Sequence, residues 1–195
     1  MNEPINRTDI RRRDRAVHDE EWLKEMMRTA ATGVLATVAD GQPLVNANLF
    51  VYDESRHALY LHTARRGNTR TTIEGHQRVA FTVMELGRLL PADTALEFST
   101  EYASVVLFGR GSVVADPEEA RYGLQLLLDK YFADLTPGSD YRPTTDDELE
   151  RTSVFRVDIE ECVGKRNRVD PGFPGARRYS SASMVATAPL EDITT

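Results

Sequence analysis

The sequence predicts a mainly β domain: an antiparallel barrel with helices packed against its outside. Three observations lead to this fold class. β-rich runs follow one another through tight turns, as antiparallel strands do, whereas a parallel sheet needs a helix between successive strands. One long β-rich run contains Gly109 and Gly111, which suits a strand that bends where a sheet curls. Helical periodicity is confined to segments that lie before and between these runs.

The composition excludes several classes of protein. Of the 195 residues, 41% are hydrophobic and 28% are charged, which is typical of a single soluble globular domain. The net charge of −7 argues against a nucleic-acid partner, because such binding depends on neutralising phosphates. The single cysteine, Cys162, excludes an intrachain disulfide framework. No run approaches the roughly 20 apolar residues of a membrane span, and no secretory signal is apparent, so we expect a cytoplasmic protein without a membrane partner.

Residues 1–18 are expected to form an N-terminal arm that precedes the domain. Its basic run, RRRDR over residues 11–15, suits a solvated arm or a contact with a partner. The first helix is predicted over residues 20–31, with Asp19 as its N-cap and acidic residues in its first turn. Apolar residues recur along it at helical spacing, which predicts one buried face.

Three strands are predicted next, over residues 33–39, 44–52 and 58–63. The first two are joined by Asp40-Gly41, a dipeptide that tolerates the positive φ angles of a tight hairpin, and should pair antiparallel. A short helix over residues 67–75 then separates this meander from a strand over residues 78–85.

An irregular, proline-containing stretch over residues 86–100 is predicted to be a loop, followed by the long strand over residues 101–115. Asp116-Pro117 then provides the cap and the first position of a helix that runs to about Phe132. A final strand is predicted over residues 153–161. The globular domain should therefore cover residues 19–170, and residues 171–195, which are poor in large aliphatic side chains, should form a flexible tail.

The segment LHTARRGNTRTT, over residues 61–72, is the most informative for function. It lies where a strand meets a short helix, whose first N–H groups are available to an anion. With Thr63, Asn68, Thr69 and Arg70 added, these donors would form a cradle for a phosphate. The spacing of a Walker A loop is absent. The alternative is a solvated basic turn.

Polar residues within two strands point to a possible ligand pocket. Alternation puts Asn46 and Asn48 on one strand face and Val45, Ala47 and Leu49 on the other, so the amides face either a polar pocket or solvent. His62 shares a strand face with Tyr60 and is a candidate hydrogen-bond donor or acid–base group, the alternative being a structural histidine.

Two further sets of residues are candidates for a second wall of this ligand pocket. Tyr102 and Ser104 share a face of the long strand, which forms either a pocket wall or a surface row. Lys165 belongs to a basic turn predicted over residues 164–168, which either reaches an anionic ligand or is solvated.

Taken together, these segments resemble the pyridoxamine 5′-phosphate oxidase-like superfamily of FMN-binding split barrels, and within it the nitroimidazole-reductase-like flavoproteins. The resemblance covers roughly residues 11–168. It is carried by GVLATVADGQPLVNANLFVY, ALYLHTARRGNTR, RVAFTV, EYASVVLFGRGSVVADPEEA and VDIEECVGK, in this order. It implies a six-stranded antiparallel split barrel that works as a homodimer, with FMN bound in a groove at the subunit interface.

The resemblance also implies roles for individual residues. Asn46, Ala47, Asn48 and Leu49 would run along the edge of the flavin ring. The ring and the phosphate would be surrounded by His62, Thr63, Asn68, Thr69 and Arg70. Tyr102 and Ser104 would come from the strand that builds the interface, and Lys165 would close the site. The chain departs from its branch at Asn46 and Asn48, near which a proline is common, and at Arg70, where lysine is common.

The function implied is that of an FMN-dependent oxidoreductase that passes electrons from reduced flavin to a small organic acceptor, such as a nitroaromatic or a quinone. His62 would position or protonate this acceptor. No pyridoxal-phosphate substrate site is evident, so oxidation of vitamin B6 is not the first choice. Two alternatives are a flavin-binding or flavin-sensing protein without turnover, and a split barrel that binds haem or a deazaflavin.

Overall fold

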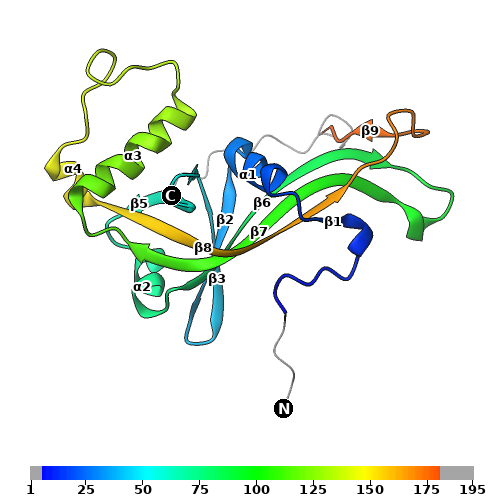
Figure 1. The fold of residues 1–195 in the computed structure, drawn as a ribbon, viewed down its shortest axis with the longest axis horizontal. Helices are drawn as coiled ribbons and strands as arrows, with labels where there is room; N and C mark the ends of the chain where they lie inside the picture. The colour runs from blue at the N-terminus through cyan, green and yellow to red at the C-terminus, as the bar shows by residue number, and fades with distance from the viewer. Residues whose placement is uncertain (1–5, 181–195) are drawn as a thin grey trace, which may run out of the picture.

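The protein is described by a computed structural model, which covers residues 6–180 (Figure 1). Its centre is one antiparallel sheet with the strand order β3-β2-β6-β7-β8-β5-β4, while β1 pairs with β8 and β9 with β6. The strands are β1 Ala16–Val17, β2 Gly33–Ala39, β3 Gln42–Asn48, β4 Val51–Asp53, β5 Ala58–Ala64, β6 Arg78–Leu90, β7 Ser99–Val113, β8 Thr152–Asn167 and β9 Arg177–Arg178. Within the described residues β3 and β4 are not paired with each other, so the sheet is open, as in a split barrel. The predicted fold class is confirmed.

Within residues 6–180, four α-helices lie around this sheet: α1 Glu20–Thr29, α2 Asn68–Gly75, α3 Pro117–Tyr131 and α4 Asp146–Arg151. Asp19 and Asp116 accept backbone N–H bonds at the starts of α1 and α3, so both predicted caps are confirmed. Helix α4 was not predicted from the sequence. It begins with a capping box between Thr145 and Glu148. None of the helices in the part of the chain that the structure describes is long and apolar enough to cross a membrane.

The strand predicted over residues 44–52 is corrected to two strands. Asp40 and Gly41 form the expected tight turn with positive φ angles, and β3 pairs with β2 along its whole length. The chain then leaves this edge, and β4 pairs with β5 at the opposite end of the strand order. The sequence pattern hides this break because apolar residues continue through it.

The loop predicted over residues 86–100 is wrong at both ends. Strand β6 continues to Leu90 and β7 begins at Ser99, so that residues 91–98 connect the two strands of a long hairpin that projects beyond α1 (Figure 1). The Arg88 guanidinium donates to both carboxylate oxygens of Glu101 at 2.8 Å and so ties the two strands together. Because Met84 and Leu86 are exposed here, apolar residues need not alternate, and the strand pattern is lost.

The predicted end of the domain is corrected as well. Strand β8 runs to Asn167, so the basic run over residues 164–168 is mostly strand and not a turn, and Lys165 pairs with Ser104 and Ala16. Of the predicted tail, Arg177–Arg178 pairs with β6, and Arg88 donates to the carbonyl of Pro171. The rest of that tail, residues 181–195, lies outside the described residues.

The main core lies on the side of the sheet that α1 covers. It contains Leu35, Phe81, Leu107 and Phe155 from the strands, together with Met27 from α1. A smaller core forms where α3 packs on β5, around Tyr60, Ala120 and Leu127. At this contact α3 needs a glycine, because a Cβ at Gly123 would lie 2.7 Å from the buried Tyr60 ring.

The other side of the β3-β2-β6-β7 region is apolar but remains exposed. We call it the outer face. Strand pairing puts its residues side by side: Val34, Val45, Ala47, Thr82, Met84, Tyr102, Ser104, Val106, Phe108 and Lys165. Val45 on the edge strand β3 and Met84 on the inner strand β6 are 72% and 69% exposed, which is unusual for two apolar side chains on one face of a sheet. The N-terminal arm covers one part, since Arg15 stacks on Tyr102 and Arg7 on Phe108.

A polar network fixes α3 to the sheet and makes the stability dependent on pH. Tyr60 donates a 2.6 Å hydrogen bond to Glu119, which Arg156 also contacts at 3.1 Å. The bond from Tyr60 lowers the pKa of Glu119, while burial and this same bond raise the pKa of Tyr60 to about 12.

Glu119→Gln is therefore expected to reduce the free energy of unfolding at pH 7 by about 1 kcal/mol. A depressed carboxyl pKa contributes stability above its unfolded value of about 4.3, and this contribution is lost as the pH falls through the folded pKa. Urea unfolding at pH 7 and pH 3 should show a difference at pH 7 that shrinks at pH 3. Equal differences at both pH values would contradict the assignment.

Candidate functional site

A cavity at the start of α2 brings together three of the predicted site residues. We call it the α2 pocket. Asn46 enters it from β3, and Asn68 and Thr69 enter it from the first turn of α2. Its volume is about 410 Å³, and its other lining residues are Leu35, Thr37, Leu44, Val45 and Gly67. Strand β3 and helix α2 meet here only because of the fold, since residues 49–67 separate them in the chain.

Hydrogen-bond donors are available in the α2 pocket. Gly67 precedes the helix and supplies no side-chain cap. The N–H groups of Arg70 and Thr71 donate to the Gly67 carbonyl, whereas no hydrogen bond within the described chain uses those of Asn68 and Thr69. A helix start with free N–H groups carries partial positive charge and suits an anion.

The two asparagines of β3 lie as their alternation predicts. Both are on the strand face opposite to Val45 and Ala47, and Asn46 reaches the α2 pocket. Asn48 is buried; its amide accepts from Asn46 Nδ2 at 3.0 Å and donates to the Asn46 carbonyl. Asn48 therefore orients Asn46, while Ala47 belongs to the outer face.

His62 lies beside a different cavity, beneath α3. We call it the α3 pocket: two adjoining hollows of about 240 and 480 Å³ that share His62, Leu124 and Thr144. The smaller hollow is strongly apolar, and its other lining residues are Leu49, Leu127, Leu128, Tyr131 and Phe132. His62 is exposed on β5, and the desolvation by the protein around its imidazole lowers its pKa, which favours the neutral form.

The end of α3 that forms this pocket is held firmly. The Tyr131 hydroxyl lies 2.7 and 2.9 Å from the carbonyl oxygens of Ala31 and Phe50 and donates its one proton to either of them. Lys130 donates to the Ala30 carbonyl and lies over the Phe50 ring, and burial lowers its pKa to about 8. Sequence reasoning missed these residues, because no local pattern links α3 to β5.

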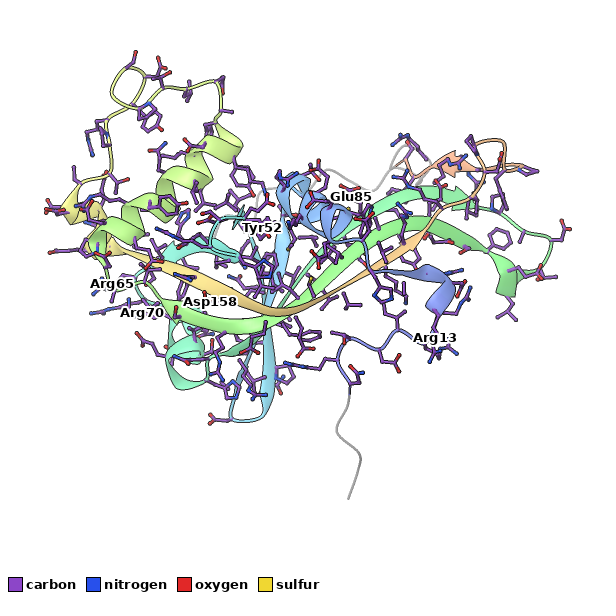
Figure 2. The ribbon with its side chains drawn as sticks, in the orientation of Figure 1. Arg13, Tyr52, Arg65, Arg70, Glu85 and Asp158 are labelled. Carbon is purple, nitrogen blue, oxygen red and sulfur yellow. The ribbon has the colours of Figure 1, made fainter. Side chains whose placement is uncertain are left out.

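Arg70 lies away from the α2 pocket. Its guanidinium donates to Glu74 at 2.8 Å and to Ser153 Oγ at 3.0 Å, on the wall of a third cavity of about 600 Å³. We call this cavity the α4 pocket, because α4 forms one wall. Figure 2 shows Arg65, which also lines it, close to Arg70 at the end of the molecule opposite to Arg13. Thr63 reaches none of these three cavities; its hydroxyl donates to the Ala64 carbonyl.

The remaining predicted residues, Tyr102, Ser104 and Lys165, lie side by side on the outer face. Asn46 extends from the opposite face of the same sheet, since it pairs with the core residue Leu35. One ligand cannot contact both sets within a single chain. The sequence-predicted residues are thus distributed over the α2, α3 and α4 pockets and the outer face.

Comparison with known proteins identifies the family. A family model described as pyridoxamine 5′-phosphate oxidase matches residues 19–166. The chain belongs to this family. The resemblance seen in the sequence is thereby confirmed. The matched residues of this pyridoxamine 5′-phosphate oxidase family member run from Asp19, the N-cap of α1, to Arg166 near the end of β8.

Solved structures of other proteins share the fold of this pyridoxamine 5′-phosphate oxidase family member. The flavocytochrome Anf3 from Azotobacter vinelandii has a TM-score of 0.74 and 24% identity, covering 98% of this chain and 91% of that one. An FAD and heme binding protein from Mycobacterium smegmatis has a TM-score of 0.69 and 22% identity, covering 93% and 90%.

A third structure is a candidate 5-nitroimidazole antibiotic resistance protein from Bacteroides thetaiotaomicron, with a TM-score of 0.64 and 20% identity, covering 77% of this chain and 86% of that one. At these identities the likeness establishes the fold alone. No match was found among curated protein sequences.

Proposed function

We propose that this chain is a flavin-binding oxidoreductase that works as a homodimer and passes electrons from reduced flavin to a small organic acceptor. The α2 pocket is the observation that carries the proposal. It combines an uncapped helix start with amide and hydroxyl side chains, next to apolar residues of β2 and β3.

The residues of the α2 pocket fit the phosphate of a flavin nucleotide. The free N–H groups of Asn68 and Thr69, the Thr69 hydroxyl and the Asn68 amide are all donors that a phosphate accepts. Asn46, oriented by Asn48, would donate to a polar edge of the ring. This donor set is common to FMN and FAD, and the relative from Mycobacterium smegmatis is described as binding FAD.

The outer face supports a second copy of this chain as the partner. Its exposed apolar residues, with Met84 and Val45 at the centre, make a surface that is costly to leave in water. A two-fold contact there would also bring Tyr102, Ser104 and Lys165 of one protomer toward the flavin of the other. Two sets that cannot meet in one chain would then form one site.

A bound flavin supplies the redox chemistry, and the protein provides orientation and hydrogen bonds. The α3 pocket would receive the acceptor. Leu49, on its wall, follows Asn46 by three residues, so the chain between the two pockets spans at most about 11 Å. His62 would contact the acceptor at the mouth of this pocket, with its neutral imidazole serving as a hydrogen-bonding group.

Thr69→Glu is expected to weaken FMN binding by at least about tenfold and to leave riboflavin binding unchanged. The new carboxylate would face the phosphate, and close like charges cost several kcal/mol, whereas riboflavin lacks the phosphate. Fluorescence titration of the flavin-free protein with both ligands measures the two affinities.

Thr71→Glu is the matched control. Thr71 is exposed in the same helix turn and lines neither the α2 nor the α3 pocket. If Thr69→Glu weakens the binding of FMN and of riboflavin equally, the phosphate does not bind at the start of α2. A protein that binds flavin but reduces no nitroaromatic or quinone would leave the flavin site intact and favour a sensing role.

A second candidate function is haem binding beside the flavin. His62 supports it, because a neutral imidazole at the edge of an apolar hollow suits an axial ligand of haem iron. Two of the structural relatives are described as a flavocytochrome and as an FAD and heme binding protein. The absorption spectrum of the purified protein separates the candidates, since haem adds a Soret band to the flavin bands.

A further inference from the structure

The α4 pocket lies directly beyond the proposed phosphate site. Gly67 lines the α2 pocket, and Arg65, two residues earlier, lines the α4 pocket. The segment from Arg65 to Asn68 spans at most about 11 Å. A group attached to the flavin phosphate would need only to pass over this segment to enter the α4 pocket.

The walls of the α4 pocket suit a nucleoside. Val113, Val114 and Leu149 provide apolar surface for a flat ring, and Thr152 and Ser153 provide hydroxyl groups nearby. The volume of about 600 Å³ is within the range of ordinary small-molecule sites. Such a mixture of apolar walls and a few polar groups is typical of a ligand pocket and not of a void in the core.

The charges in this pocket leave one cation unpaired. Arg70 is bound to Glu74, and Asp146 is bound to Arg121. The guanidinium of Arg65 makes no hydrogen bond or ion pair with any other part of the described chain, although its backbone is fixed by bonds to Arg151 and Ser153. The Glu150 carboxylate also has no hydrogen-bond or ion-pair partner among residues 6–180, and a carboxylate suits the hydroxyl groups of a ribose.

We propose that the α4 pocket holds the adenosine monophosphate half of FAD, with Arg65 bound to its phosphate, and that the chain therefore selects FAD over FMN. The inference rests on the proposed flavin site at the start of α2. It adds the identity of the cofactor: FMN would occupy the α2 pocket alone, whereas FAD would occupy both pockets.

The test compares FMN and FAD binding to flavin-free protein by isothermal titration. The unmodified protein should bind FAD at least about tenfold more tightly than FMN. Arg65→Ala should weaken FAD binding by about tenfold to a hundredfold, the usual effect of losing a charge-assisted bond. It should leave the affinity for FMN unchanged.

A second variant tests the pocket itself. Ala115 is exposed on its wall, so Ala115→Trp should fold and fill the space. This variant should also weaken the binding of FAD and leave the binding of FMN unchanged. Arg78→Ala is the control, because Arg78 is an exposed arginine without a side-chain partner in the described chain and lies outside this pocket; it should change neither affinity.

The outcomes separate the two proposals. Equal affinities of the unmodified protein for FMN and FAD would overturn the inference and leave the flavin function standing. If either pocket variant weakens the binding of FMN and FAD equally, the inference is likewise overturned and the flavin function still stands. Failure of both flavins to bind the unmodified protein would overturn the flavin function itself, and the inference with it.

Discussion

Met84→Asp is expected to convert the protein from a dimer to a monomer and to abolish tight flavin binding. Met84 is 69% exposed in the middle of the outer face, between Thr82 and Leu86 along β6. In a two-fold interface each substitution occurs twice, and a buried, unpaired carboxylate costs several kcal/mol. The flavin would lose Tyr102, Ser104 and Lys165 of the other protomer at the same time.

Light scattering at micromolar concentration, combined with fluorescence titration of FMN and FAD, measures both effects. Met84→Leu should remain a dimer, because it keeps the apolar surface. Leu135→Asp is the second control: Leu135 is an exposed leucine in the loop after α3 and is not part of the outer face. A monomeric unmodified protein that binds flavin tightly would show that the site is complete in one chain.

His62→Ala is expected to abolish haem binding and to leave flavin binding intact. His62 is the single histidine among the residues that line the α3 pocket. The two tyrosines there already have hydrogen-bond partners, since Tyr131 bonds to backbone carbonyls and Tyr141 accepts from Gln125. The proposed flavin contacts lie in the α2 pocket, which His62 does not line. The Soret band of the haem-loaded protein should disappear, while the flavin absorbance is retained.

His76→Ala is the matched control, because His76 is an exposed histidine at the end of α2 and should leave the Soret band unchanged. If the unmodified protein takes up no haem, the second candidate function is wrong, and stopped-flow reoxidation of reduced flavin then tests the first. There, loss of His62 should slow electron transfer to a nitroaromatic or quinone. Loss of flavin itself in His62→Ala would make this residue a cofactor contact.

Local patterns in the sequence were sufficient for the elements that short-range interactions determine. Asp19 and Asp116 mark helix starts because a side-chain oxygen there satisfies free N–H groups of the first turn. Asp40-Gly41 makes the β2–β3 turn because both residues adopt positive φ angles. Alternation along β3 correctly separated Asn46 and Asn48 from Val45 and Ala47, since a strand presents successive side chains to opposite faces.

The alternation of apolar and polar residues gave wrong predictions where the burial of one strand face no longer determines which residue types occur along the strand. From Met84 to Leu86 strand β6 has three exposed residues in succession, and residues 87–89 are half-buried, so the strand lacks alternation and resembled a loop. The run over residues 44–52 resembled one strand because apolar residues continue from β3 into β4, although these two strands lie at opposite ends of the strand order. The hydrophobic pattern of a segment indicates whether its residues are buried, but it does not indicate which strand the segment pairs with.

The candidate site depended on the tertiary structure even more strongly. The sequence by itself determined the types of residue that could hold a flavin phosphate, and it identified the junction of β5 and α2 as the place to look. Only the fold decided that Asn68 and Thr69 meet Asn46, that Arg70 turns to Ser153, and that His62 lies beneath α3. The physical reason is that these contacts join segments far apart in the chain, through strand pairing and helix packing, which local periodicity does not encode.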